Sequence, residues 1–144
     1  MLKACLALLV ALISLGAASA QEQHSLAQLQ HNARVLMVFA PDSNSASFKA
    51  QLALIERHSF ELSARNTVVV PVSTASHYGD ERFSFENMPL GTATDQAEAR
   101  NRFHVKDGDF VVILISEDGT EQIRSAHPVD IHELTARLDA GPRR

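Results

Sequence analysis

Residues 34–73 read RVLMVFAPDSNSASFKAQLALIERHSFELSARNTVVVPVS, and this stretch sets the fold class of the chain. Its two ends, residues 34–40 and 67–73, are nearly continuous apolar runs. Such runs are typical of strands that are buried on both faces of a sheet. Residues 46–65 between them carry apolar side chains at helical spacing, namely Phe48, Leu52, Ile55 and Leu62. The stretch therefore predicts a β-α-β unit with parallel strands and a right-handed crossover.

Local signals mark the ends of this helix and the place of the second strand. Ser45 precedes the helix as an N-cap residue, and Asn66 ends the helix. Pro71 has no backbone N–H to donate to a neighbouring strand. We therefore expect the strand at residues 67–73 to lie at an edge of the sheet.

A β-hairpin is expected in the C-terminal part of the chain. Residues 110–116 read FVVILIS, and a second extended run covers residues 120–125. Asp118 and Gly119 separate the two runs, and an Asp-Gly pair in this position is typical of a type I′ turn. The two strands should therefore be antiparallel.

Helices are expected at three other places. Residues 25–32 fit a short helix, and residues 94–103 fit a charged, weakly amphipathic one. The run from Asp130 to Glu133 is a capping box, which opens a final helix that ends at about residue 140. Residues 74–91 have no regular pattern and are expected to form an unusually long loop.

The order of these elements is β-α-β-α-β-β-α after the first short helix. It predicts an α/β fold with a four-strand mixed sheet, strands in the spatial order 2-1-3-4, and helices on both faces. This arrangement resembles the thioredoxin core. When the thioredoxin pattern is laid over the chain, Ser43 and Ala46 take the places of the two cysteines. Asp109 takes the place of the cis-proline, so all three chemical hallmarks are missing.

The first twenty residues, MLKACLALLVALISLGAASA, have the pattern of a cleavable signal peptide. Lys3 precedes the apolar run, and an A-S-A cleavage site predicts a cut between Ala20 and Gln21. The run is shorter than the roughly 20 residues that span a bilayer, so no membrane span is expected after cleavage. We expect a signal peptide at residues 1–20 and one domain at residues 21–144, located in a periplasm or outside the cell.

Composition fits one globular domain and limits its chemistry. The chain has 144 residues, 45% of them hydrophobic, and a formal net charge of −4, which gives no reason to expect nucleic-acid binding. Its one cysteine, Cys5, lies in the predicted signal peptide. The mature chain would therefore have no thiol, and thiol-based redox catalysis is not expected.

Three segments resemble the secreted "domain of unknown function 4174" family. They are RVLMVFAP at residues 34–41, FVVILISEDGTEQIRS at residues 110–125 and HPVDIHELTARLDAGPRR at residues 127–144. The family is related to repeats of vertebrate matrix proteins such as equarin. The resemblance implies a thioredoxin-like fold in a secreted protein, and it brings no established activity.

Ser43, Ser45 and Asp109 are the candidate ligand-binding residues. The two serines lie at a helix N-terminus, which presents free N–H groups and a partial positive charge, and Asp109 lies in a loop at the same presumed edge. A turn and a helix cap explain the serines as well. We expect no catalytic residue and no cofactor site, since no G-x-S-x-G elbow accompanies a serine.

Seven histidines are spread along the chain without the spacing of a zinc motif such as H-E-x-x-H. They are His24, His31, His58, His77, His104, His127 and His132. Surface histidines explain this pattern, so no metal ligand is assigned. A periplasmic metal-binding protein, in which some of them meet through the fold, is kept as an alternative.

These observations favour a secreted or periplasmic thioredoxin-fold protein that binds an unknown protein or small molecule without catalysing a reaction. A cysteine-independent oxidoreductase-like enzyme is the other alternative. In the loop at residues 74–91, Phe83, Phe85 and Met88 form either a partner-binding patch or a lid on the sheet edge.

Overall fold

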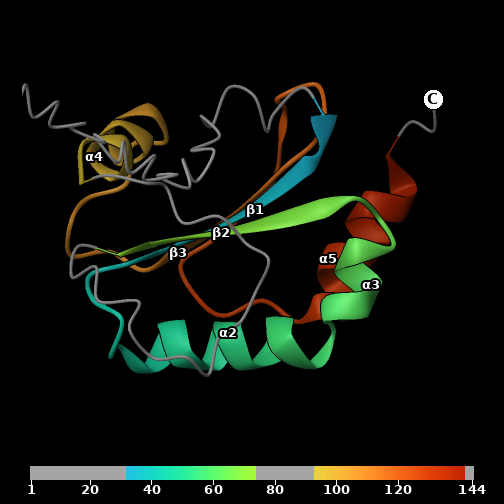
Figure 1. Cartoon of the computed structure of the whole chain (residues 1–144), viewed down its shortest axis with the longest axis horizontal. Coiled ribbons are helices and arrows are strands. Elements are labelled where there is room, and N and C mark those ends of the chain that lie inside the picture. Colours follow the sequence, from blue (N-terminus) through green and yellow to red (C-terminus); the bar gives the residue numbers. More distant parts are fainter. Residues whose placement is uncertain (1–31, 74–92, 142–144) are drawn as a thin grey trace, which may run out of the picture.

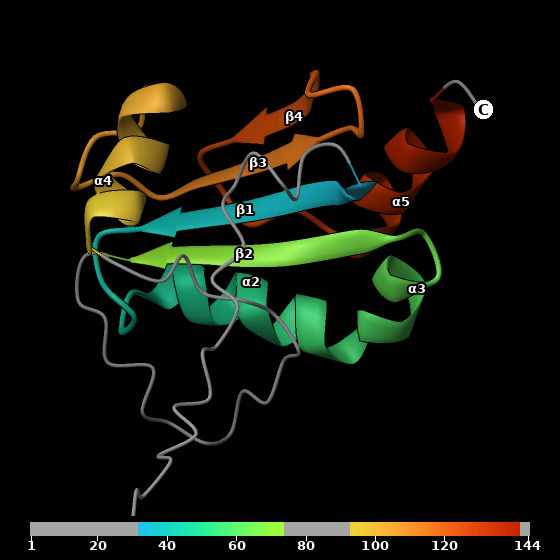
Figure 2. The same cartoon turned by 45° about the horizontal axis from the view of Figure 1, so that its top comes forward.

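The computed structural model of the chain describes residues 32–73 and 93–141, which are built around a four-stranded mixed sheet (Figure 2). The strands lie in the order β2 (Thr67–Ser73), β1 (Arg34–Ala40), β3 (Val111–Ile115) and β4 (Glu121–Ser125). β1 is parallel to β2 and antiparallel to β3, and β3 pairs antiparallel with β4. The predicted strand order and directions are confirmed.

Alternation of side chains along the central strands creates two hydrophobic cores. In β1, Leu36 and Val38 belong to one core, whereas Met37 and Phe39 belong to the other. The first face is covered by α2 (Ala46–Arg57), α3 (Ser59–Ser63) and α5 (Ile131–Ala140). The opposite face carries α4 (Ala93–Arg102), as Figure 1 shows. The predicted placement of helices on both faces is therefore confirmed.

Pro71 lies where its missing N–H costs least. Among the described strands, β2 lies at an edge of the sheet and pairs with β1 alone, with Pro71 in register with Val38. A proline on an edge strand removes a donor that no neighbouring strand needs. The predicted edge position is confirmed.

The single helix expected over residues 46–65 is wrong, because the chain leaves helical geometry at His58. Its φ of −116° and ψ of 23° end α2 and start α3. His58 and Ser59 are weak helix formers, so the helix is easily interrupted at this pair. Leu62 after the break still reaches the first core, where it is buried. Asn66, with a φ of 51°, adopts the left-handed conformation and ends this segment as predicted.

The hairpin between β3 and β4 is confirmed, but its turn is not of type I′. That type needs a positive φ at both central residues, and only Gly119 has one, at 84°. Gly119 N–H donates to Ser116 O (2.9 Å), and Ser116 N–H donates to Thr120 O (2.9 Å). This pattern fits a type I turn followed by a glycine bulge. The Asp118 carboxylate holds the turn by accepting from Thr120 N–H (2.9 Å).

Several expectations fall outside the described residues. They are the signal peptide at residues 1–20, the helix at residues 25–32 except for its last residue, and the loop at residues 74–91 with its two phenylalanines and methionine. Of the helices that the structure describes, none has the length and apolar character to cross a membrane.

Candidate functional site

The candidate site lies at the end of the sheet where β1 and β2 finish. The turn after β1 leads into α2, and the Asp42 carboxylate holds that turn by accepting from Asn44 N–H (2.7 Å). Ser45 is the N-cap of α2, because its Oγ accepts from Phe48 N–H (3.3 Å). Ser43 lies half-buried within the turn. The capping role of Ser45 is thus confirmed, and a ligand role for either serine stays a prediction.

Asp109 lies at the same end of the sheet, directly before β3. The pairing of Phe39 with Val111 brings the start of β3 beside the end of β1. Asp109 is exposed, and its N–H donates to Lys106 O (3.1 Å) within a turn. Among the described residues, no hydrogen bond or ion pair links Asp109 to Ser43 or Ser45. The fold therefore brings the three predicted residues to one end without joining them.

Arg100, in the last turn of α4, connects the ends of β1 and β2 to the loop after α4. Its guanidinium donates to the carbonyl oxygens of Ala40 (2.6 Å) and Val72 (3.3 Å), at the ends of β1 and β2. It also donates to Lys106 O (3.1 Å) in the loop after α4. The side chain thus ties two strand ends to one loop, and its guanidinium carbon lies 5.8 Å from the centre of the Phe39 ring.

The charge of Arg100 is buried and incompletely compensated. The residue is only 4% exposed, and its Nε has no hydrogen-bond partner among the described residues. Among the described residues, the carboxylate beside Nε is that of Asp107, whose Oδ1 lies 4.0 Å away, which is too long for a hydrogen bond, and the Asp107 side chain is 88% exposed. Burial lowers the pKa of Arg100, and the charges of Asp107 and Asp109 oppose this only in part. A buried cation in this position would gain from a further anion.

A pocket of about 570 Å³ opens beside Arg100. It is lined by Ala97, Arg100, Asn101, His104, Val105, Lys106 and Asp107. His104, with a φ of 53°, starts the turn that brings Lys106 and Asp107 back over the end of α4. The pocket thus combines three basic side chains with one carboxylate, a composition suited to an anionic ligand.

Sequence reasoning missed Arg100 as a site residue. It lies in a strongly charged helix, where an arginine normally faces solvent, and no motif surrounds it. Only the packing of α4 on the second face of the sheet shows that it is buried.

The histidines separate into distinct places in the structure. His58 and His132 lie together between α3 and α5, with ring centres 5.2 Å apart, while His104 lines the pocket and His127 is exposed. The other three lie outside the described residues. Within the described residues, no group of three or more His, Cys, Asp or Glu side chains is already arranged to hold a metal ion.

A family model described as "Domain of unknown function (DUF4174)" matches residues 25–144. The chain belongs to this family. No curated relative matches the chain. The site described above therefore belongs to a DUF4174 domain. The description of the family names no reaction.

Solved structures of thiol:disulfide interchange proteins and of a peroxiredoxin resemble this DUF4174 domain. A thiol:disulfide interchange protein from Bacteroides sp. has a TM-score of 0.63 and 13% identity, covering 83% of this chain and 80% of its own. A reduced 2-Cys peroxiredoxin from Plasmodium vivax has a TM-score of 0.60 and 15% identity, covering 80% of each chain. A putative thiol:disulfide interchange protein DsbE from Chlorobium tepidum has a TM-score of 0.59 and 16% identity, covering 76% of this chain and 82% of its own. At such low identity the likeness shows the fold alone, which is thioredoxin-like as predicted.

Proposed function

We propose that the chain is a secreted or periplasmic binding module that uses no thiol chemistry and holds an anionic group of its ligand in the Arg100 pocket. The observation that carries this proposal is a buried arginine whose charge is incompletely compensated, at the end of a thioredoxin-like sheet where β1 and β2 finish. The ligand is a small molecule or a protein segment that presents a carboxylate or a phosphate.

The residues at the head of α2 support a role without redox catalysis. Ser43 and Ala46 stand where thioredoxins carry cysteines, and no cysteine follows Cys5 in the chain. Ser45 is committed to capping α2, which leaves it poorly placed to act as a nucleophile. Location outside the cytoplasm is supported by the signal-peptide pattern of residues 1–20.

Charge favours an anion in the pocket. Among the described residues, the hydrogen bonds of Arg100 go to three neutral carbonyl oxygens, and its Nε has no partner, so no anion bonded to the guanidinium balances its positive charge. Lys106 is exposed at the mouth of the same pocket. Asp107 competes with an incoming anion, because it is the carboxylate within 4.0 Å of Arg100 Nε.

Titration with inorganic phosphate, followed by backbone NMR, tests the pocket. Saturable shifts are expected at the amides of Asn101, Lys106 and Asp107. Asp107→Asn removes a nearby negative charge, and it should tighten binding about fivefold, which corresponds to about 1 kcal/mol for charges at this distance in water. Glu117→Gln, at the exposed hairpin turn, is the matched control and should leave the affinity unchanged.

Arg100→Met should abolish the phosphate shifts. Because this change also frees two strand-end carbonyls, its fold is checked by circular dichroism, and Lys106→Met serves as a milder second variant. Absence of saturable shifts in the unmodified chain, or equal binding after Asp107→Asn and Glu117→Gln, would contradict the anion site.

Redox assays separate the binding module from an oxidoreductase. The purified chain without residues 1–20 is expected to show no insulin reduction and no peroxide consumption, since no thiol is present to react. Clear turnover in either assay would support the cysteine-independent enzyme instead.

A further inference from the structure

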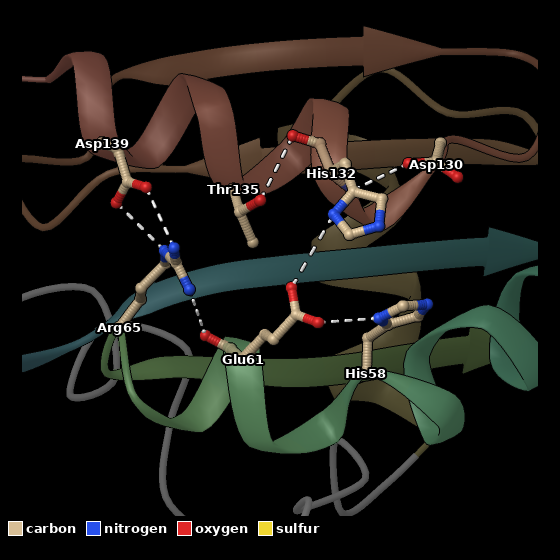
Figure 3. A network of polar contacts seen from close by, with 7 residues as sticks. All are labelled: His58, Glu61, Arg65, Asp130, His132, Thr135 and Asp139. Atoms are coloured by element: carbon tan, nitrogen blue, oxygen red, sulfur yellow. Dashed lines mark hydrogen bonds and ion pairs between the residues drawn. The ribbon is translucent and has the colours of Figure 1, made fainter.

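A second polar cluster lies between α3 and α5, at the end of the sheet opposite to α4 (Figures 2 and 3). His58, at the junction of α2 and α3, holds Glu61 through a contact of 2.9 Å between Nδ1 and Oε1. His132, in the first turn of α5, places its Nδ1 3.9 Å from Glu61 Oε2. Two imidazoles from different helices thus converge on one carboxylate.

Neighbouring contacts fix the frame that carries these three side chains. Arg65 and Asp139 join α3 to α5 through two hydrogen bonds, of 3.0 and 2.9 Å, about one helical turn beyond Glu61 (Figure 3). Asp130 caps α5 by accepting from His132 N–H (2.8 Å). The backbones of both helices are therefore held in place, while the His132 side chain is 72% exposed and contacts the His58 ring edge-to-face, with ring centres 5.2 Å apart.

We propose that His58, Glu61 and His132 bind one divalent late transition-metal ion, such as Zn²⁺ or Cu²⁺, between α3 and α5. Imidazole nitrogens with one carboxylate are a donor set that suits these ions. The site is independent of the proposed function, because it lies away from the Arg100 pocket.

The distances are close to those of a bound state. Donor atoms at about 2.0–2.2 Å from one ion lie roughly 2.9–3.5 Å from each other. The 2.9 Å between His58 Nδ1 and Glu61 Oε1 is within this range, and the 3.9 Å from His132 Nδ1 to Glu61 Oε2 is slightly longer. The site is not assembled as it stands. Rotation of the exposed His132 side chain toward Glu61 would complete the set.

Charge and exposure also favour binding here. Glu61 is half-buried, and its carboxylate lies within reach of both His58 and His132. A glutamate carboxylate is ionised at neutral pH, as a metal ligand must be. The His132 side chain is 72% exposed, so an ion bound there could be reached from solvent and keep water as a remaining ligand.

Calorimetric titration of the tag-free chain with ZnCl₂ tests this site. One ion per chain is expected, and His58→Ala and His132→Ala should each weaken binding at least about tenfold, since even indirect partners of metal ligands contribute 10- to 100-fold. His127→Ala is the matched control, because His127 is exposed and outside the cluster. Its affinity should equal that of the unmodified chain.

Spectroscopy and stability give a second readout. With CuCl₂, electron paramagnetic resonance should show nitrogen coupling that is reduced in both cluster variants. Zn²⁺ should also raise the melting temperature of the unmodified chain, since an ion that binds only the folded state stabilises it. Absence of stoichiometric binding, or binding that survives either cluster substitution, would overturn the proposal. If His58→Ala fails to fold, the exposed His132 decides the outcome alone.

Discussion

Gln51 shows how one polar side chain can fix a distant loop. It lies in α2 with no exposed surface, and its amide makes two hydrogen bonds to the backbone of Val129. Val129 N–H donates to Oε1 (2.7 Å), and Nε2 donates to Val129 O (3.2 Å). These bonds attach the segment before α5 to α2. A polar residue within the apolar stripe of a helix was the signal for this role in the sequence.

Gln51→Met keeps the volume but removes both bonds. We expect a loss of about 2–4 kcal/mol in the free energy of unfolding, because two buried backbone groups are left without partners. Urea denaturation measures the loss. Gln122→Met, on the exposed strand β4, is the control and should change stability by less than about 0.5 kcal/mol. Equal losses in the two variants would show that the Gln51 bonds contribute nothing specific.

The roles of some individual residues in the candidate sites could not be predicted from the sequence. Arg100 has no sequence signal, since burial alone distinguishes it from the other arginine in the last turn of α4. His58 and His132 are far apart in the chain, and only the packing of α3 against α5 brings them together. Sites made from such residues depend on tertiary distances, which composition and local spacing do not encode.

Among the elements, the strands were predictable and the break between α2 and α3 was not. Apolar runs at residues 34–40 and 111–115 mark buried strands whatever surrounds them. The break at His58 reflects a small local difference in helix propensity, which a continuing apolar stripe conceals. The turn type of the β3–β4 hairpin was missed because only Gly119 of the Asp-Gly pair adopts a positive φ, while the Asp118 carboxylate accepts from Thr120 N–H.

The start of α2 depends on its cap. Ser45→Ala should lower the free energy of unfolding by about 1 kcal/mol, because Phe48 N–H loses its acceptor. Chemical denaturation checks this value. Ser43→Ala in the preceding turn is the matched control, and it should cost less than about 0.5 kcal/mol. A reversed order of the two losses would contradict the capping assignment.

The α3–α5 cluster should make stability depend on pH in acid. In the folded chain the hydrogen bond with His58 lowers the pKa of Glu61 below its ordinary value of 4.5. The stabilisation from Glu61 is therefore complete above pH 4.5 and is lost as the pH falls through the lower folded pKa. Glu61→Gln should flatten this part of the stability curve, measured by urea midpoints at a series of pH values. Glu117→Gln should leave the curve unchanged, and an unchanged curve in Glu61→Gln would contradict the assignment.

At the scale of the whole molecule, the fold could be read from the order of its elements. A β-α-β unit followed by a helix, a hairpin and a last helix has few right-handed solutions, and the structure adopts the predicted one. The same fold occurs in a 2-Cys peroxiredoxin and in a thiol:disulfide interchange protein. Function did not follow from the fold, because one scaffold hosts many functions that differ in their site residues.

Export of the whole chain is a further prediction. When the full chain is expressed in a bacterium, we expect a periplasmic or extracellular product that begins at Gln21, because residues 1–20 have a signal-peptide pattern. Cell fractionation and mass spectrometry of the intact product measure this. Leu9→Arg places a charge in the apolar run and should retain an uncleaved chain in the cytoplasm. A full-length product in the cytoplasm of the unmodified strain would contradict export.

The two outer strands of the sheet affect how readily another chain can add a strand to it. An unpaired strand edge is a template on which another chain can add a strand, and this is a common start of aggregation. On β2, Pro71 interrupts the row of N–H donors that such a chain would need. On β4, Glu121 and Arg124 form an exposed ion pair (2.8 Å), which places charges along the other edge. Both edges thus carry groups that disfavour the addition of a strand from another chain.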